Sequence, residues 1–89
     1  MIQLSQLMAD RPYPESGQML YDYMSPLLAK GESVTLDLAG GVSLPSMFLN
    51  ASVGIAAREY GVDTIKKNIA FRNVTKTQAE RLKEYFSRL

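Results

Sequence analysis

Hydrophobic and polar residues alternate in three short stretches of the chain, around residues 2–5, 34–39 and 69–74. A period of two places the apolar side chains on one face, so each stretch predicts a half-buried β-strand, the first only weakly. The apolar faces consist of Ile2 and Leu4 in the first stretch, Val34, Leu36 and Leu38 in the second, and Ile69 and Phe71 in the third.

After the first strand, apolar residues recur with the period of an α-helix, between Ser16 and Gly31. Ser16 can cap a helix there, and Gly31 is placed to end it. Pro26 lacks an amide hydrogen and crowds the preceding turn, so we expect it to kink or restart the helix. The apolar stripe of this helix consists of Leu20, Tyr23, Met24, Leu27 and Leu28.

A second apolar helix is predicted between the second and third strands, from Met47 to Tyr60. Gly54 would let it approach the sheet closely, and Gly61 is its expected end. Residues 62–68 predict one further short turn before the third strand.

The last helix is predicted from its capping sequence. Thr75 with Gln78 three residues later is a capping box. Its core-facing residues are expected to be Ala79, Leu82, Phe86 and Leu89.

The order β-α-β-α-β-α implies crossover helices and therefore a parallel or mixed sheet. The alternating strands favour helices mainly on one face, which makes residues 1–89 a single small two-layer α/β domain. Thr35, Asp37 and Arg72 would lie on the uncovered face. That face is either solvated, with an ion pair between Asp37 and Arg72, or a docking face for a partner or a second copy.

The composition excludes several kinds of catalytic and metal-binding sites. The chain has no cysteine and no histidine, which excludes thiolate chemistry, disulfides, the usual zinc ligands and the commonest general base. No pair of carboxylates is spaced for acid–base catalysis. We therefore expect a protein that is not an enzyme and needs no metal or other cofactor.

Charge is unevenly distributed. Residues 1–50 carry two basic and five acidic residues, a net charge of −3, and residues 51–89 carry eight basic and four acidic residues, a net charge of +4. The signs alternate along the helical segments, which is typical of a solvated face, so nucleic acid is not expected as a partner. Neither an apolar run of about 18 residues nor a signal peptide is present, so we expect a cytoplasmic protein without membrane contact.

The strand around residues 34–39 runs through two glycines toward Ser46. Gly40 and Gly41 supply the backbone freedom for a sharp exit from the strand. Pro45 disfavours helical geometry at the residue before it, which places the start of the next helix at Ser46.

Ser46 has two interpretations at that position. As a helix cap, its oxygen would accept an amide hydrogen from Phe48 or Leu49, which stabilises a helix by about 1 kcal/mol. As a functional residue, it would carry or bind a phosphate, because free amides and the helix dipole favour an anion there. Most helices that begin with serine meet these conditions, so spacing alone does not distinguish the two interpretations of Ser46.

The chain resembles the STAS-like domains, small bacterial domains of largely undefined function that are related to the anti-sigma factor antagonists. The likeness spans nearly the whole chain. It is carried by the order of elements, by Arg11, Ser16 and Gly17 before the first helix, by VTLDLAGG at 34–41, and by LPSMFLN at 44–50, which ends in FLN at 48–50.

The resemblance implies a regulatory protein-interaction module without catalytic activity. In the antagonists, a serine or threonine at the start of the second helix is phosphorylated by a partner ATPase-type kinase, and phosphorylation breaks the complex. Ser46 lies near that position and Ser43 is a second candidate, but LPSM replaces the acidic residue and glycine of the antagonist motif. The expected partner is such a kinase or another regulator, and a homodimer is an alternative.

The residues expected to bind the partner or to be regulated lie in the 40–47 loop and the second helix. They are Ser46, Ser43, Gly40, Gly41, Met47 and Asn50. The alternative function is a small anion- or nucleotide-binding module that uses the 40–47 loop and the helix N-terminus.

Overall fold

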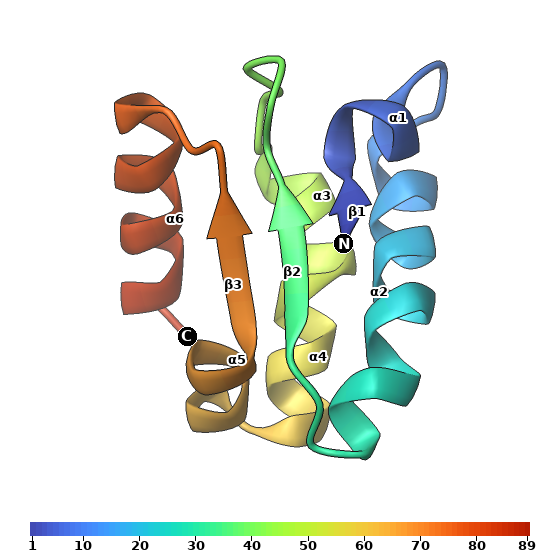
Figure 1. The fold of residues 1–89 in the computed structure, drawn as a ribbon, viewed down its shortest axis with the longest axis vertical. Coiled ribbons are helices and arrows are strands. Elements are labelled where there is room, and N and C mark those ends of the chain that lie inside the picture. The colour runs from blue at the N-terminus through green and yellow to red at the C-terminus, as the bar shows by residue number, and fades with distance from the viewer.

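The computed structural model describes residues 1–89 and contains one sheet of three parallel strands. The strands are β1 (Ile2–Gln3), β2 (Val34–Asp37) and β3 (Ile69–Arg72), in the spatial order β1-β2-β3 (Figure 1). β2 pairs with both neighbours, with Leu36 beside Ile2 on one side and beside Phe71 on the other. The predicted α/β class and parallel pairing are confirmed.

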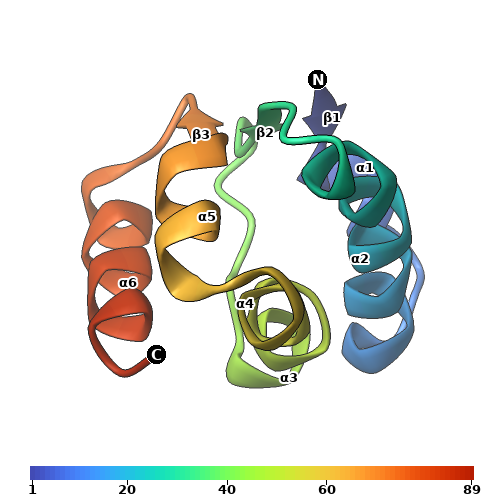
Figure 2. The same ribbon diagram turned by 90° about the horizontal axis from the view of Figure 1, so that it is seen from below.

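The helices lie on one face of the sheet, and the other face is uncovered (Figure 2). The helix bounds are α1 (Leu4–Met8), α2 (Tyr13–Ala29), α3 (Ser46–Ala51), α4 (Val53–Tyr60), α5 (Val62–Asn68) and α6 (Lys76–Ser87). None of them combines the length and apolar character needed to cross a bilayer. The two-layer arrangement with helices on one side is therefore as predicted.

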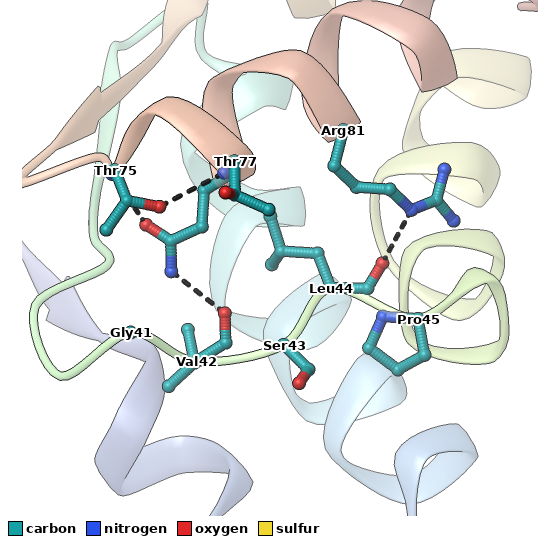
Figure 3. Close-up of a pocket in the computed structure, with 9 residues that line it drawn as sticks. Gly41, Val42, Ser43, Leu44, Pro45, Thr75, Thr77 and Arg81 are labelled. Carbon is teal, nitrogen blue, oxygen red and sulfur yellow. Dashed lines mark hydrogen bonds between the residues drawn. The ribbon is translucent and has the colours of Figure 1, made fainter.

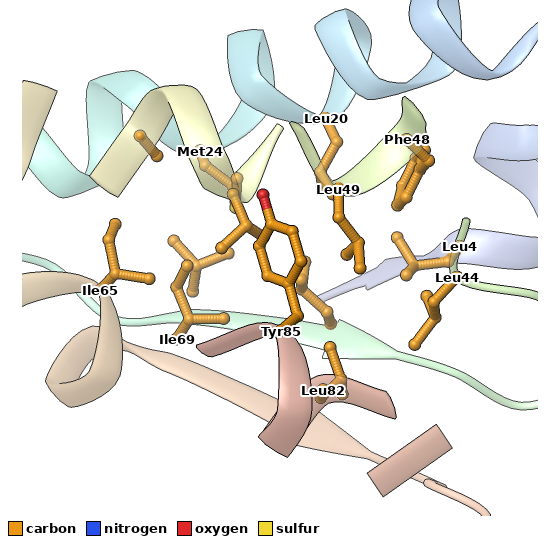
Figure 4. Packing of buried hydrophobic residues seen from close by; sticks show 14 of the residues in the cluster. Leu4, Leu20, Met24, Leu44, Phe48, Leu49, Ile65, Ile69, Leu82 and Tyr85 are labelled. Atoms are coloured by element: carbon orange, nitrogen blue, oxygen red, sulfur yellow. The ribbon is translucent and has the colours of Figure 1, made fainter. Parts of the chain in front are cut away.

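The core lies between β2 and the helical layer (Figure 4). Every apolar residue predicted for the inner face of β2 is buried, and the stripe of α2 meets it from the other side. The largest fully buried apolar side chains are Phe48, Leu4, Leu20, Met24, Leu36, Leu38, Leu49, Ile65, Val34 and Val53. Burial of this continuous apolar cluster is the main contribution to the stability of the fold.

The first strand is shorter than predicted. β1 ends at Gln3, and Leu4 begins α1, whose buried residues are Leu4 and Leu7. A spacing of three residues is typical of a helix, and it competes here with the alternation that predicted a strand.

Helix α2 begins earlier than predicted. Its N-cap is Pro12, and Pro14 lies in the first turn, where a proline is tolerated because the amide would be free. Ser16 is therefore not the cap. It is fully buried within the helix, and its hydroxyl donates to the carbonyl of Tyr13.

The end of α2 confirms one prediction and corrects another. The helix does not restart at Pro26 but continues to Ala29, because the buried stripe of Leu20, Met24 and Leu28 holds both sides of the proline in the core. Gly31 follows in the left-handed conformation, with φ of 73°, and its amide donates to the carbonyl of Leu28. Gly31 is thus the C-terminal glycine that was expected.

The single helix predicted from Met47 to Tyr60 is wrong. It is divided at Ser52, which has φ and ψ of −122° and −86°. Ser52 is fully buried, and its hydroxyl donates to the carbonyl of Phe48 at 2.8 Å. This bond lets the chain change direction between α3 and α4 without leaving a buried hydroxyl unpaired.

The neighbour of Gly54 also differs from the prediction. A methyl group at Gly54 would lie 2.6 Å from the hydroxyl oxygen of Tyr85 in α6, so the close approach is to that helix and not to the sheet. Gly61, with φ of 92°, ends α4 as predicted. The turn expected afterwards is the helix α5, whose Ile65 is fully buried.

Helix α6 has the predicted capping box at Thr75 and Gln78. Its buried face consists of Gln78, Leu82 and Tyr85, while Ala79 is exposed and Leu89 follows the helix with 41% of its surface exposed. The buried face is shifted from the predicted one toward Gln78 and Tyr85, which directly precede Ala79 and Phe86 in the sequence. Phe86, which was also predicted, is half-buried against the core.

Candidate functional site

The loop from β2 to α3 passes the carboxyl end of the sheet. Gly40 and Gly41 have φ of 96° and 67°, a conformation that other residues rarely adopt, and they turn the chain out of the strand as expected. In parallel α/β sheets this end is the usual place for a binding site. Residues 40–45 are called the exit loop below.

Two side chains of α6 hold the exit loop (Figure 3). The side-chain amide of Gln78 donates to the carbonyl of Val42 at 2.8 Å. Nε of Arg81 donates to the carbonyl of Leu44 at 3.1 Å. The loop carbonyls, which have no strand or helix partner, are thus satisfied by side chains from a helix more than 30 residues later in the chain.

Gln78 connects the loop to the start of α6. Its side-chain oxygen accepts from the amide of Thr75 at 2.9 Å, and the Thr75 hydroxyl oxygen accepts from the amide of Gln78 at 3.1 Å. This reciprocal cap fixes the orientation of the glutamine amide, so its nitrogen faces Val42. One side chain therefore caps α6 and positions the exit loop.

Ser46 is the first residue of α3, but it does not cap the helix. The amides of Phe48 and Leu49 donate to the carbonyl of Pro45, at 3.1 Å and 3.0 Å. No side chain makes a capping hydrogen bond at this end. The cap predicted for Ser46 is therefore wrong, because Pro45 takes the N-cap position and its own carbonyl receives both amides.

The hydroxyl of Ser46 instead faces Arg81. Nη2 of Arg81 donates to Oγ of Ser46 at 2.8 Å, and Ser46 is exposed. Arg81 thus spans from the Leu44 carbonyl to the Ser46 hydroxyl, and it also lies over the ring of Tyr85, 5.9 Å from the ring centre.

A groove of about 540 Å³ lies between the exit loop and the first turns of α6. Exit-loop residues line one side of it, and Thr75 with residues of α6 lines the other. The lining residues are Gly41, Val42, Ser43, Leu44, Pro45, Thr75, Thr77, Gln78 and Arg81 (Figure 3). This groove is called the α6 groove below.

The six residues predicted from sequence are only partly brought together. Gly41 and Ser43 line the α6 groove, and Ser46 is joined to it through Arg81. Met47 follows Ser46 with 59% of its surface exposed. Gly40 faces α1 instead, since a methyl group there would lie 3.7 Å from Cβ of Ser5.

Asn50 lies outside the α6 groove and contacts α6 at another point. Its side-chain oxygen accepts from the hydroxyl of Tyr85 at 2.8 Å, which ties α3 to α6. Burial raises the pKa of the Tyr85 hydroxyl, so this donor keeps its proton at neutral pH. Asn50 therefore positions the helix that carries Ser46 relative to the helix that carries Arg81.

Asp37, at the carboxyl end of β2, does not form the predicted ion pair with Arg72. Its Oδ1 accepts from the side-chain amide of Asn73 at 2.8 Å and from the amide of Ala39 at 2.9 Å. These two bonds, Asn73 first, hold the pKa of Asp37 below its ordinary value, and its burial opposes them. Only 4% of Asp37 is exposed, so this side chain, which was expected on the uncovered face, is buried. Arg72 lies beside Asp37 in the register and adds only a small lowering of the pKa.

Sequence reasoning missed Gln78 and Arg81 as site residues. Gln78 was identified only as half of a capping box. Arg81 lies one helical turn later, on the same face of α6, so the pair was visible in the spacing. What the spacing could not show was that this face meets a loop carrying free carbonyls.

No group of three or more histidine, cysteine, aspartate or glutamate side chains is placed to hold a metal ion. Among protein families, the model described as "STAS-like domain of unknown function (DUF4325)" matches residues 16–79. No curated protein and no solved structure matches the chain. The matched segment runs from α2 into the first turn of α6 and contains the exit loop, Ser46 and Gln78.

Proposed function

The chain belongs to the family of STAS-like domains of unknown function, and from that premise we propose that it is a non-enzymatic regulatory module that binds a protein partner. The binding surface comprises the exit loop, the start of α3 and the adjoining side of α6. Phosphorylation of Ser46 switches the interaction off. The partner is an ATPase-type kinase or another regulator, as in the anti-sigma factor antagonists that the family resembles.

The observation that carries this proposal is the environment of Ser46. Its hydroxyl is exposed at a helix start, has no capping bond to make, and accepts a hydrogen bond from Arg81. A serine kept only as a cap would bond an amide of its own helix. A hydroxyl that faces a guanidinium is instead placed where a phosphoryl group could be held once added.

A phosphoryl group on Ser46 would act in two ways. It adds a charge of about −1.5 to −2 beside the exposed Met47, so an apolar partner surface would have to desolvate that charge. It also offers Arg81 three oxygen acceptors, which compete with the carbonyl of Leu44 for the guanidinium. Both effects weaken a complex that requires the unmodified surface and the present exit-loop conformation.

A second function is favoured by the α6 groove. About 540 Å³ of space beside Arg81, Thr75 and Thr77 could hold a small anion or the phosphate of a nucleotide. The start of α3 contributes less to such a site than its sequence suggested, because the Phe48 and Leu49 amides already donate to Pro45. If this function holds, phosphate or a nucleotide raises the melting temperature of wild type, and Arg81→Ala abolishes the shift.

The test of the regulatory proposal compares two aspartate substitutions. The partner is captured with wild type from cells of the source, identified, purified, and titrated against Ser46→Asp and Ser33→Asp. Ser33 is exposed and precedes β2, at the end of the sheet away from the exit loop, so its variant carries the same charge change elsewhere. We expect Ser46→Asp to bind at least tenfold more weakly and Ser33→Asp to bind like wild type. Equal affinity of the two variants would overturn the proposal.

A further inference from the structure

Strand β3 is an edge of the sheet, and the backbone groups of Phe71 on its outer side are free. The amide of Leu38 donates to the carbonyl of Arg72, so Arg72 faces β2. In a parallel ladder, the amide and carbonyl of one residue point to the same side and successive residues alternate, so those of Phe71 point away from β2. No turn, loop or cap hydrogen bond takes up either group of Phe71.

An apolar groove lies beside this strand and is lined by residues of β3, α5 and α6. These three elements lie on the left in Figure 1. It has a volume of about 470 Å³ and is called the β3 groove. Its apolar residues are Ile65, Ile69, Phe71 and Phe86. Phe71 and Phe86 meet edge to face, 6.2 Å between ring centres, and both remain partly exposed.

The rim of the β3 groove is positively charged. Lys66 at the end of α5 and Lys83 in α6 are exposed lining residues, and no acidic side chain lines the groove. Neither lysine forms an ion pair, since Glu84 with Arg88 is the only ion pair in the structure. The groove therefore offers apolar contact and two cations without a counter-charge.

We propose that the β3 groove binds an extended acidic segment of a partner protein, which adds to the sheet as a strand beside β3. Main-chain hydrogen bonds to Phe71 give such a strand its affinity. Apolar side chains at alternate positions enter the groove, and acidic side chains between them reach Lys66 and Lys83. This site lies on a different edge of the molecule from Ser46 and does not depend on the function proposed above.

A second copy of the chain fits this edge poorly. The opposite edge of the sheet, β1, has two residues and cannot match the four of β3. Pairing β3 with β3 of another copy would bring the lysines of both copies together, and like charges at close range are unfavourable. An acidic segment satisfies both the backbone groups and the lysines.

The test is a selection with a display library of random ten-residue peptides on the full chain. The peptides that are enriched should combine acidic and apolar residues. Each is then titrated against a double variant, Lys66→Glu with Lys83→Glu, and against a matched control, Lys67→Glu with Lys76→Glu, which changes the same charge on exposed lysines outside the groove. We expect at least a tenfold loss of affinity for the first pair and less than a twofold change for the control.

Hydrogen exchange distinguishes strand addition from a contact through charge alone. In the complex, the amide of Phe71 should exchange at least tenfold more slowly than in the free chain, while the amide of Ala70, which faces β2, should change little. Enriched peptides without acidic residues, equal affinity for the two double variants, an unprotected Phe71 amide, or no enriched peptide would each overturn the proposal. A concentration-dependent dimer lost in the Lys66→Glu, Lys83→Glu variant would assign the groove to a second copy and overturn it as well.

Discussion

Helix α3 is held differently on its two sides. Toward α2 the contact is apolar and close, with Gly17 of α2 against Ala51 and the Phe48 carbonyl. Toward α6 the contact is polar, through Arg81 to Ser46 and Asn50 to Tyr85. The first side cannot shift without losing packing, whereas the second can exchange hydrogen-bond partners at little cost. The candidate regulatory serine lies on the adjustable side.

The largest expected effect lies on the apolar side. Phe48→Ala removes the largest fully buried side chain and should lower the free energy of unfolding by about 4 kcal/mol. Met47→Ala, at the exposed neighbouring position, should change it by less than about 0.5 kcal/mol. Urea unfolding of the two variants measures the difference. Similar losses in both would contradict the burial of Phe48 in the core and the exposure of Met47.

Gly17→Ala tests the close approach of α2 to α3. A methyl group at Gly17 would lie 2.6 Å from Cβ of Ala51 and 2.7 Å from the carbonyl oxygen of Phe48, so the helices must separate. We expect a loss of about 2 kcal/mol in unfolding free energy, despite the better helix propensity of alanine. Gln18→Ala, exposed in the same helix, is the control. A stabilised Gly17→Ala variant would contradict the packing described.

Gln78→Ala tests the polar side. It removes the reciprocal cap with Thr75 and leaves the Val42 carbonyl without its donor, which should cost about 1.5 kcal/mol. Glu80→Ala, exposed on the same helix, should cost less than about 0.5 kcal/mol. Exit-loop amides should exchange faster in Gln78→Ala only. If they exchange as in wild type, Gln78 does not position the loop.

The smallest expected effect concerns pH. Asp37 has a lowered pKa in the folded protein, so its hydrogen bonds add stability above the ordinary aspartate pKa of about 3.9, and this stability is lost as the pH falls through the folded value. Asn73→Gly keeps the left-handed backbone, with φ of 56°, but removes the main donor. The pKa of Asp37, measured by NMR titration, should rise toward the ordinary value. An unchanged pKa would exclude Asn73 as the cause.

The sheet was predictable because its signals are local. Alternation in β2 and β3 sets the buried face, and crossover helices dictate parallel strands, so the open face followed from sequence. Asp37, which was expected to be exposed on that face, is nevertheless buried. The ends of helices were less predictable, because neighbouring residues compete for the same capping position. Pro12 and Pro45 take the N-cap positions expected for Ser16 and Ser46, and the buried Ser52 divides one predicted helix into two.

Only one side of the candidate site was predictable from the sequence. The two glycines and Ser46 identified the exit loop, but its other wall comes from α6, more than 30 residues away in sequence. Which side chain meets a free carbonyl depends on the packed arrangement of elements, and no local pattern encodes it. Asn50 and Tyr85 belong to the same class of long-range pair, at 2.8 Å.

The most direct test of the regulatory role is the chemical state of Ser46 in the cell. The protein is isolated from its source with phosphatases inhibited, and its intact mass and phosphorylated positions are measured by mass spectrometry. We predict a fraction of molecules heavier by one phosphoryl group, with that group on Ser46. A chain that is never phosphorylated, or is phosphorylated only at other residues, would contradict the proposed switch.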